Sequence, residues 1–359
     1  MLVNGYRLEF RILDRRGIPP DADTGQTGLH PADPLPEAAY IRSRPPRINP
    51  PSMPQTDNLA SRGCTLAAVR QLVLRHFNHV SSITMTDSRL AFIGGGNMAR
   101  SLIGGLIADG WEPGLICVAD PDERQMETLA ARFPIDTTRD NQVAVEQANA
   151  VVLAVKPQII GAVARALAPA VSRQRPLVIS IAAGIRETAL RHWLGEDTAI
   201  VRAMPNTPAL VQSGATALYA NPGVSEDQRN LAESILRAVG LALWVEDEAL
   251  MDAVTALSGS GPAYFFLFME ALQSAGKQLG LSEETARLLT LQTAFGASKM
   301  ALESSDDAAT LRRRVTSPGG TTERAIEVLQ QHDFEAVVRQ ALEAATERSR
   351  ELANEFGKD

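Results

Sequence analysis

The strongest chemical signal in this chain is a glycine turn in the segment LAFIGGGNMA. Gly94, Gly96 and Ala99 have the spacing G-x-G-x-x-A, directly after an apolar run and at the start of a predicted helix. In such a turn the first glycine permits a tight bend. The second lets a pyrophosphate approach the backbone, and the small third residue lets helix and strand pack closely. This context predicts dinucleotide binding rather than a purely structural turn.

Asp120 and Arg124, which follow the next apolar run, bear on which nicotinamide cofactor is bound. Asp120 stands where an acidic side chain accepts a hydrogen bond from the ribose 2′-hydroxyl of NAD. Arg124, one helical turn later, could instead bind the 2′-phosphate of NADP. Because the two residues favour different cofactors, the sequence predicts NADPH or NADH without choosing between them.

A second glycine pair lies far along the chain, in the segment RRRVTSPGGTTERA. Gly319 and Gly320 precede a predicted helix but follow no strand, so this is not a second nucleotide turn. Backbone N–H groups at a helix N-terminus, where the helix dipole is positive, favour an anion. We expect the carboxylate of a substrate here, and Arg314 is the one arginine of the three that we expect near it.

The residues that are absent from the predicted strand ends also carry information. Carbonyl reductases usually place an acid beside the oxygen that receives a proton. No histidine lies near a predicted strand end, and Tyr264 is followed four residues later by Phe268, so a Tyr-x-x-x-Lys pair is absent. A protonated imine arrives positively charged and becomes a neutral amine. The pattern therefore favours reduction of a carbon–nitrogen bond.

These motifs need a scaffold, and the apolar pattern supplies one. Predicted strands at 90–93, 115–119, 150–155, 177–182, 216–219 and 242–245 alternate with helical segments. Such alternation favours a parallel sheet covered on both faces. After Glu248 only helices are predicted, at 249–257, 262–279, 282–303, 306–314, 321–331 and 334–356.

The helix containing AYFFLFMEAL is apolar on nearly every side, which suggests a subunit interface. The alternative is the central helix of a monomeric bundle. We therefore expect an α/β Rossmann domain at 85–247, followed by an all-α helical domain at 248–359 for dimerisation and substrate binding. Residues 1–84 are rich in proline, and we interpret them as a disordered or non-native N-terminal extension, with a partner-binding tail as the alternative.

Composition narrows the function classes. Of the 359 residues, 45% are hydrophobic and 21% charged, and no apolar run approaches the ~20 residues that cross a bilayer. The net charge of −7 comes without a basic stripe, so we expect neither a membrane nor a nucleic-acid partner. Cys64 and Cys117 form no metal-binding spacing; we expect no metal, reduced thiols and a cytoplasmic location.

Six segments, in order between about Arg89 and Leu352, resemble the pyrroline-5-carboxylate reductase family. They read FIGGGNM, AVKPQ, SIAAGI, RAMPNTPALV, AVTALSGSGPAYFF and RRVTSPGGTTERAIEVL. That family makes L-proline by reducing 1-pyrroline-5-carboxylate with NAD(P)H. The resemblance implies a Rossmann domain, a helical domain that interlocks with a second subunit, and a dimer or larger assembly.

The resemblance also assigns residues one by one. It implies that the cofactor is bound by Ile93, Gly94, Gly95, Gly96, Asn97, Met98, Asp120, Asn141, Ala154, Val155, Lys156, Pro157, Ala182, Ala183, Asn206 and Glu248. It implies that the substrate is bound by Val315, Ser317, Gly319, Gly320, Thr321 and Thr322. Thr322 is the catalytic candidate, because its hydroxyl would hydrogen-bond the ring nitrogen. Where some members carry a glutamate ahead of this loop, this chain has Ser305, which leaves a catalytic carboxylate there in doubt.

Other functions remain as alternatives. One is a reductase of another cyclic imine or of a β-hydroxy acid, although the Lys-x-x-x-Asn pair of the hydroxy-acid enzymes is absent: Leu281 follows Lys277 and Glu303 follows Lys299 at that spacing. Another is a non-catalytic NAD(P)-binding regulatory protein, which predicts a disrupted substrate loop. Within the site, Asn206 between two prolines has the plain alternative of holding a turn.

Overall fold

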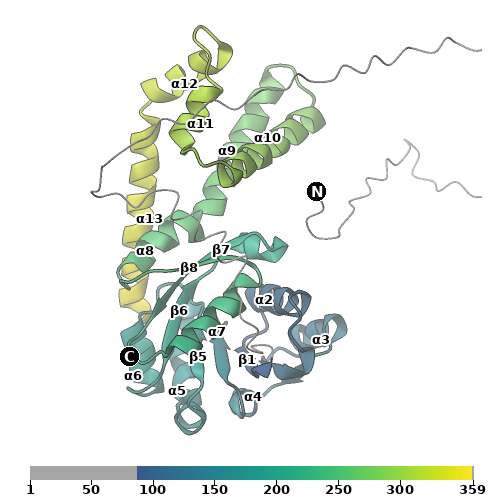
Figure 1. Ribbon diagram of the computed structural model, residues 1–359, viewed down its shortest axis with the longest axis vertical. Helices are drawn as coiled ribbons and strands as arrows, with labels where there is room; N and C mark the ends of the chain where they lie inside the picture. Colours follow the sequence, from purple (N-terminus) through teal and green to yellow (C-terminus); the bar gives the residue numbers. More distant parts are fainter. Residues whose placement is uncertain (1–86, 358–359) are drawn as a thin grey trace, which may run out of the picture. The chain divides into compact units, whose positions relative to one another are not determined.

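The computed structural model describes residues 87–357 (Figure 1). Our interpretation of residues 1–84 lies outside this described part. No helix within it is long and apolar enough to cross a membrane.

The first part of the fold is an eight-stranded sheet. The strands are β1 (Leu90–Ile93), β2 (Ile116–Ala119), β3 (Asp136–Thr138), β4 (Ala150–Leu153), β5 (Leu177–Ser180), β6 (Ile200–Met204), β7 (Gly214–Ala220) and β8 (Gly240–Trp244). Their order in the sheet is β3-β2-β1-β4-β5-β6-β7-β8, and every neighbouring pair is parallel except β6 and β7. The predicted parallel sheet is confirmed, with one antiparallel pair that the pattern did not predict. Residues 205–213 join β6 to β7. Because this short connection contains no crossover helix, β7 runs antiparallel to β6.

Helices connect the strands and cover the sheet. They are α2 (Asn97–Ala108), α3 (Glu123–Arg132), α4 (Asn141–Val145), α5 (Pro157–Gln174), α6 (Glu187–Leu194) and α7 (Glu226–Arg237), with 3-10 turns η2 (Pro113–Leu115) and η3 (Thr207–Val211). One core cluster joins the sheet to α2, α3 and α7, and the other joins it to α4, α5 and α6. Neighbouring residues of one strand serve opposite clusters: Phe92 lies in the first and Ile93 in the second. The central strands β1 and β4 are continuous apolar runs because both faces of the sheet are covered there.

The second part of the chain is helical. It consists of α8 (Leu250–Val254), the π-helical turn η4 (Thr255–Gly259), α9 (Gly261–Gln278), α10 (Glu283–Glu303), α11 (Ala308–Arg314), α12 (Thr321–Gln331) and α13 (Phe334–Phe356). The helix predicted at 249–257 is thus an α-helix that widens into a π turn. Near the end of α13, Ser349 Oγ donates to Asp252 Oδ1 at 2.7 Å, which ties the last helix to the start of the helical part.

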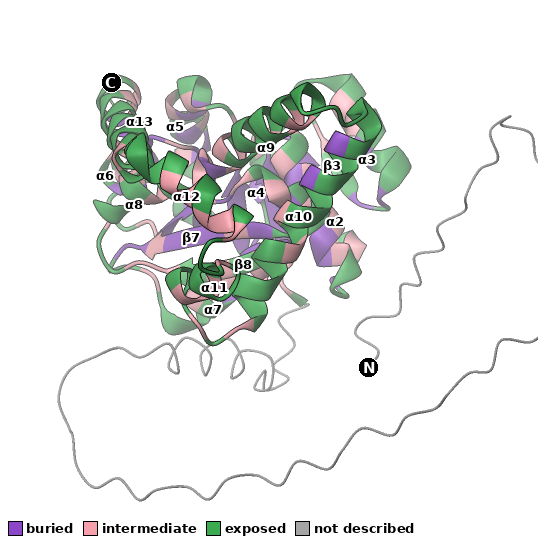
Figure 2. Ribbon diagram, turned by 90° about the horizontal axis from the view of Figure 1, so that it is seen from above, coloured by how far each residue is buried: buried purple, intermediate pink, exposed green. Residues whose placement is uncertain are grey.

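Helices α9 and α10 are largely exposed (Figure 2), and many of their exposed side chains are large and apolar. Phe265, Phe266 and Phe295 are each 63% exposed in this single chain. Helix α9 is therefore not the buried centre of a monomeric bundle. Contiguous exposed apolar surface of this kind marks an interaction surface.

The packing of α2 yields a stability prediction. A Cβ built on Gly105 would lie 2.4 Å from the carbonyl oxygen of Ala238, which follows α7. Although alanine favours a helix by about 1 kcal/mol over glycine, we expect Gly105→Ala to lower the free energy of unfolding by about 1–3 kcal/mol through overpacking against rigid backbone. Thermal unfolding measures this.

The matched control is Gly104→Ala, in the same helix. There a Cβ would meet only the end of the Phe133 ring, at 3.2 Å, so stability should stay within about 1 kcal/mol of wild type. A Gly105→Ala protein as stable as the Gly104→Ala protein would contradict this account of α2.

Candidate active site

The glycine turn between β1 and α2 is shaped by a close backbone approach. Gly94 has φ of +102°, and a Cβ on it would lie 2.7 Å from the carbonyl oxygen of Ala154 at the end of β4. Its N–H donates to Ala119 O at 2.8 Å. A side chain would meet both a left-handed backbone and a steric clash, so this position requires glycine.

Gly96 is the N-cap of α2, and no side chain in the described part caps the helix. A Cβ built on Gly96 would meet nothing within 4 Å. The glycine therefore leaves open space beside the N-terminus of α2, at the positive end of the helix dipole. This arrangement fits a pyrophosphate.

Asp120 holds this turn in place. Its Oδ2 accepts a hydrogen bond from Gly95 N at 2.7 Å, and its Oδ1 accepts one from Asp122 N at 2.8 Å. Arg124 is exposed on the following helix. Each carboxylate oxygen retains a further lone pair, so the roles of Asp120 and Arg124 toward the cofactor stay predictions and the choice between NADH and NADPH stays open.

The other predicted cofactor residues lie mainly at ends of neighbouring strands. Ala154 and Val155 follow β4, and Ala154 N donates to Ile93 O at 2.8 Å. Exposed Lys156 precedes Pro157, the first residue of α5. Ala182 and Ala183 follow β5, and Asn141 is the first residue of α4. Met98, in the first turn of α2, packs against the hydrophobic core. Because β1, β4 and β5 are parallel neighbours, their carboxyl ends meet at one edge of the sheet, where the fold binds dinucleotides.

Asn206 uses both ends of its side chain within the protein. Its Oδ1 accepts from Ala215 N at 2.9 Å, and its Nδ2 donates to Ser258 O at 3.1 Å. These contacts support the alternative interpretation, in which Asn206 holds a turn. A contact between Asn206 and the nicotinamide stays a prediction.

Glu248 belongs to a polar cluster that the sequence analysis missed. Its Oε1 lies 2.6 Å from Arg202 Nη1 and also accepts from Glu187 N at 2.6 Å. Asn221 Nδ2 donates to Glu187 Oε1 at 2.9 Å. Burial, followed by the charges of Glu248 and Glu187, raises the pKa of Tyr219, which pairs with Arg202 across the sheet. An arginine inside an apolar strand is the signal that could have revealed this cluster, since a buried charge needs a partner.

The second glycine pair begins α12. Gly319 has φ of +72°, and its N–H donates to Glu323 Oε2 at 2.6 Å. Gly320 is the N-cap, without a side-chain cap, and Thr321 and Thr322 are the first two residues of the helix. Val315 is 60% exposed and Ser317 is exposed. The expected Arg314 is paired with Asp306. No hydrogen bond within residues 87–357 joins this loop to the Gly94 turn.

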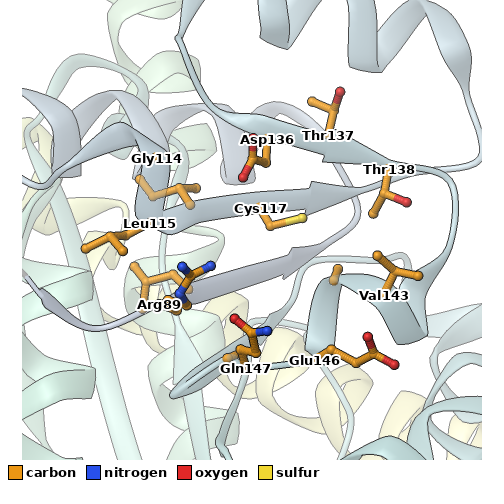
Figure 3. A pocket seen from close by; sticks show the side chains of 14 residues that line it. Arg89, Gly114, Leu115, Cys117, Asp136, Thr137, Thr138, Val143, Glu146 and Gln147 are labelled. Atoms are coloured by element: carbon orange, nitrogen blue, oxygen red, sulfur yellow. The ribbon is translucent and has the colours of Figure 1, made fainter.

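Two of the cavities in the described residues bear on the predicted site. One of about 390 Å³ lies beside β2 and β3 and contains none of the predicted site residues (Figure 3). Burial, with a smaller contribution from Asp136, raises the pKa of its Cys117 thiol to about 11, so the thiol stays protonated at neutral pH. The other, of about 400 Å³, is lined by Asn97 and Arg100 of α2 together with residues of η3.

Comparisons with known proteins decide the family. Residues 248–352 match the family described as "Pyrroline-5-carboxylate reductase dimerisation", and residues 89–184 match "NADP oxidoreductase coenzyme F420-dependent". A pyrroline-5-carboxylate reductase of Pseudomonas aeruginosa is 56% identical over 76% of this chain and 100% of its own length. One of Pasteurella multocida is 46% identical over the same shares. The chain belongs to the pyrroline-5-carboxylate reductase family.

Solved structures of the family agree with the fold. The Coxiella burnetii reductase has 50% identity and a TM-score of 0.72, covering 74% of this chain and 98% of its own. The Plasmodium falciparum enzyme, solved with NADP bound, has 31% identity and a TM-score of 0.67, covering 75% and 99%. The predicted architecture, a Rossmann domain followed by a helical dimerisation domain, is confirmed.

The open space at Gly96 predicts a selective loss of cofactor affinity. We expect Gly96→Ala to weaken NAD(P)H binding at least about tenfold, because an added methyl group would meet the bound pyrophosphate and disturb its backbone hydrogen bonds. The melting temperature of the cofactor-free protein should stay unchanged, since the methyl group meets no protein atom. Fluorescence titration and thermal unfolding measure the two effects.

Gly94→Ala is the comparison variant. Its methyl group collides with Ala154, so it should lose both stability and cofactor affinity. Unaltered NAD(P)H affinity in Gly96→Ala would show that the pyrophosphate lies elsewhere.

The polar cluster predicts a different result at Glu248. Its side chain is 22% exposed and that of Arg202 only 9%, so Glu248→Ala would leave a nearly buried guanidinium unpaired. We expect a loss of about 3 kcal/mol in the free energy of unfolding. The same change at the exposed Glu246 should stay within about 0.5 kcal/mol of wild type. Equal stability of the two variants in chemical denaturation would show that the pair contributes nothing.

Proposed function

We propose that this chain reduces 1-pyrroline-5-carboxylate to L-proline with NADPH or NADH, the last step of proline biosynthesis. The observation that carries the proposal is the presence of two uncapped, glycine-led helix N-termini in one chain, at α2 and at α12. The first fits a pyrophosphate and the second a small carboxylate. The 56% identity to a full-length relative of that name supports the same reaction.

The cofactor half of the site is the carboxyl edge of the sheet. The backbone of Ile93–Met98 holds the pyrophosphate, and Asp120 lies beside the adenosine ribose. Asn141, residues 154–157, Ala182, Ala183, Asn206 and Glu248 complete the proposed surroundings. When bound there, the nicotinamide supplies a hydride. The family member from Plasmodium falciparum, solved with NADP, supports a nicotinamide cofactor of this kind.

The substrate half is the loop before α12. Backbone N–H groups of Gly319, Gly320 and Thr321 hold the carboxylate, with Val315 and Ser317 beside the ring. Glu323 accepts the Gly319 N–H and the Ser317 carbonyl accepts the Gly320 N–H, so the carboxylate of the substrate displaces these contacts or uses the Thr321 N–H. The Thr322 hydroxyl hydrogen-bonds the ring nitrogen. Reduction turns a protonated imine into a neutral amine, so the residues need to orient the C=N bond more than to donate a proton.

A second copy of the chain completes the assembly. The exposed phenylalanines of α9 and the apolar side chains of α10 form the surface proposed for self-association. Covering that surface stabilises the assembly by the hydrophobic effect, about 25 cal/mol for each Å² removed from water. We keep 85–247 and 248–359 as the domain boundaries, and we propose a cytoplasmic location, where thiols stay reduced.

The reaction is tested by mixing the purified full chain with 1-pyrroline-5-carboxylate and either NADPH or NADH. Nicotinamide absorbance should fall, with one L-proline formed for each cofactor oxidised. The ratio of the two rates measures the cofactor preference. If neither cofactor is oxidised, the proposal is wrong, and activity only on a cyclic imine without the carboxylate would favour the alternative substrate class.

Thr322 carries the catalytic prediction. We expect Thr322→Ala to lower kcat by about 10- to 100-fold, at the low end of contributions from positioned proton donors. Thr322→Ser keeps the hydroxyl and should retain most of the activity. Steady-state kinetics of the three proteins provide the comparison, and wild-type kcat in Thr322→Ala would remove this residue from the catalytic role.

A further inference from the structure

The π-helical turn before α9 leaves one carbonyl without a helical partner. The Ser258 carbonyl would accept from residue 262 in an α-helix, but that residue is Pro262, which has no N–H. In a π-helix it would accept from Ala263, whose N–H donates instead to Ser260 O at 3.0 Å. A half-buried carbonyl left in this state costs free energy unless another donor reaches it.

Asn206 supplies that donor from the other part of the fold. Its Nδ2 lies 3.1 Å from Ser258 O, while its Oδ1 accepts from Ala215 N at 2.9 Å. The two contacts need opposite chemistry, one donor and one acceptor, and the side-chain amide of Asn206 supplies both from two separate atoms. Aspartate has no N–H, and serine has one group where two are needed.

Packing brings the same two segments into direct contact. A Cβ built on Gly259 would lie 2.5 Å from Cε of Met204, which ends β6 two residues before Asn206. The segment Met204–Asn206 therefore lies against the turn that begins the helical part. One bridging amide and one methionine side chain join this segment to that turn.

We propose that Asn206 is a positioning residue, which fixes the segment proposed as the nicotinamide wall against the helical domain that carries the substrate loop. The inference rests on the proposed function, since it concerns the alignment of the two halves of that site. A misplacement of about 1 Å between reacting groups can lower a rate by 10²-fold. In this positioning role Asn206 acts through the Ser258 carbonyl.

The test uses Asn206→Asp in the full chain. The carboxylate keeps the acceptor for Ala215 N but sets an oxygen against Ser258 O, so the bridge is lost with almost no change in shape. We expect kcat for 1-pyrroline-5-carboxylate to fall about 10- to 100-fold. The dissociation constant of NAD(P)H should change less than about threefold, since the pyrophosphate turn is untouched.

The matched control is Asn149→Asp. Asn149 lies in the same domain, and its Oδ1 accepts from Arg89 N at 2.8 Å, a contact that aspartate preserves. Its kcat should stay within about twofold of wild type. If Asn206→Asp fails to fold, Asn206→Ala, which removes the bridge without adding a charge, takes its place.

A double variant separates positioning from stability. Pro262→Ala restores an N–H that the Ser258 carbonyl can use within its own helix. Combined with Asn206→Ala, which leaves no oxygen facing the Ser258 carbonyl, it should recover part of the lost melting temperature but not kcat, because the two segments remain unconnected. A role confined to stability would recover both.

The inference is wrong if Asn206→Asp keeps wild-type kcat, or if kcat returns together with the melting temperature in the double variant. It is also wrong if the dissociation constant of NAD(P)H rises as much as kcat falls, which would make Asn206 a direct cofactor contact. If the wild-type chain turns over 1-pyrroline-5-carboxylate and Asn206→Asp has the same kcat, only this inference is wrong. An inactive wild-type chain overturns the proposed function and this inference with it.

Discussion

The backbone contact between Gly94 and the end of β4 is the constraint on which the site depends. With no Cβ at Gly94, the turn after β1 comes against the carbonyl of Ala154, and α2 starts directly above the carboxyl edge of the sheet. The order β2-β1-β4 places Asp120 on one side of this turn and the end of β4 on the other. The shape of the proposed cofactor site therefore depends on Gly94, a position that cannot carry a side chain.

Both proposed halves of the site rely on the N-terminus of a helix, but the surroundings of the two helices differ. At α2 and at α12 a glycine stands at the N-cap, and the first N–H groups lack a side-chain cap. The turn at α2 follows a strand and has open space for a pyrophosphate. The turn at α12 follows another helix, and Glu323 shows that a carboxylate can accept its Gly319 N–H at 2.6 Å. This contact supports the proposal that the second position binds a small carboxylate.

Local pattern predicted much of this fold. The strand at 90–93 and the helix at 334–356 have the bounds that apolar periodicity gave them, and the whole helical part appears in the predicted order. The strands β3 and β6 were missed. The first has three residues and little apolar character, and Arg202 interrupts the apolar run of the second.

Long-range partners explain the remaining differences at the site. Nothing near Glu248 in the sequence reveals that Arg202 will face it, and nothing near Asn206 reveals the Ser258 carbonyl. Family resemblance placed both residues near the cofactor, whereas the structure gives each a contact that holds the fold. Motif types and spacings were thus readable from the sequence, but pairings across the fold were not.

We propose that this protein brings a nicotinamide and 1-pyrroline-5-carboxylate together for direct hydride transfer. NAD(P)H carrying deuterium at the transferable position of the nicotinamide tests this proposal, with L-proline analysed by mass spectrometry and NMR. We expect one deuterium for each proline, on the ring carbon that was doubly bonded to nitrogen. Proline without deuterium at that carbon, from cofactor labelled on either face, would contradict it.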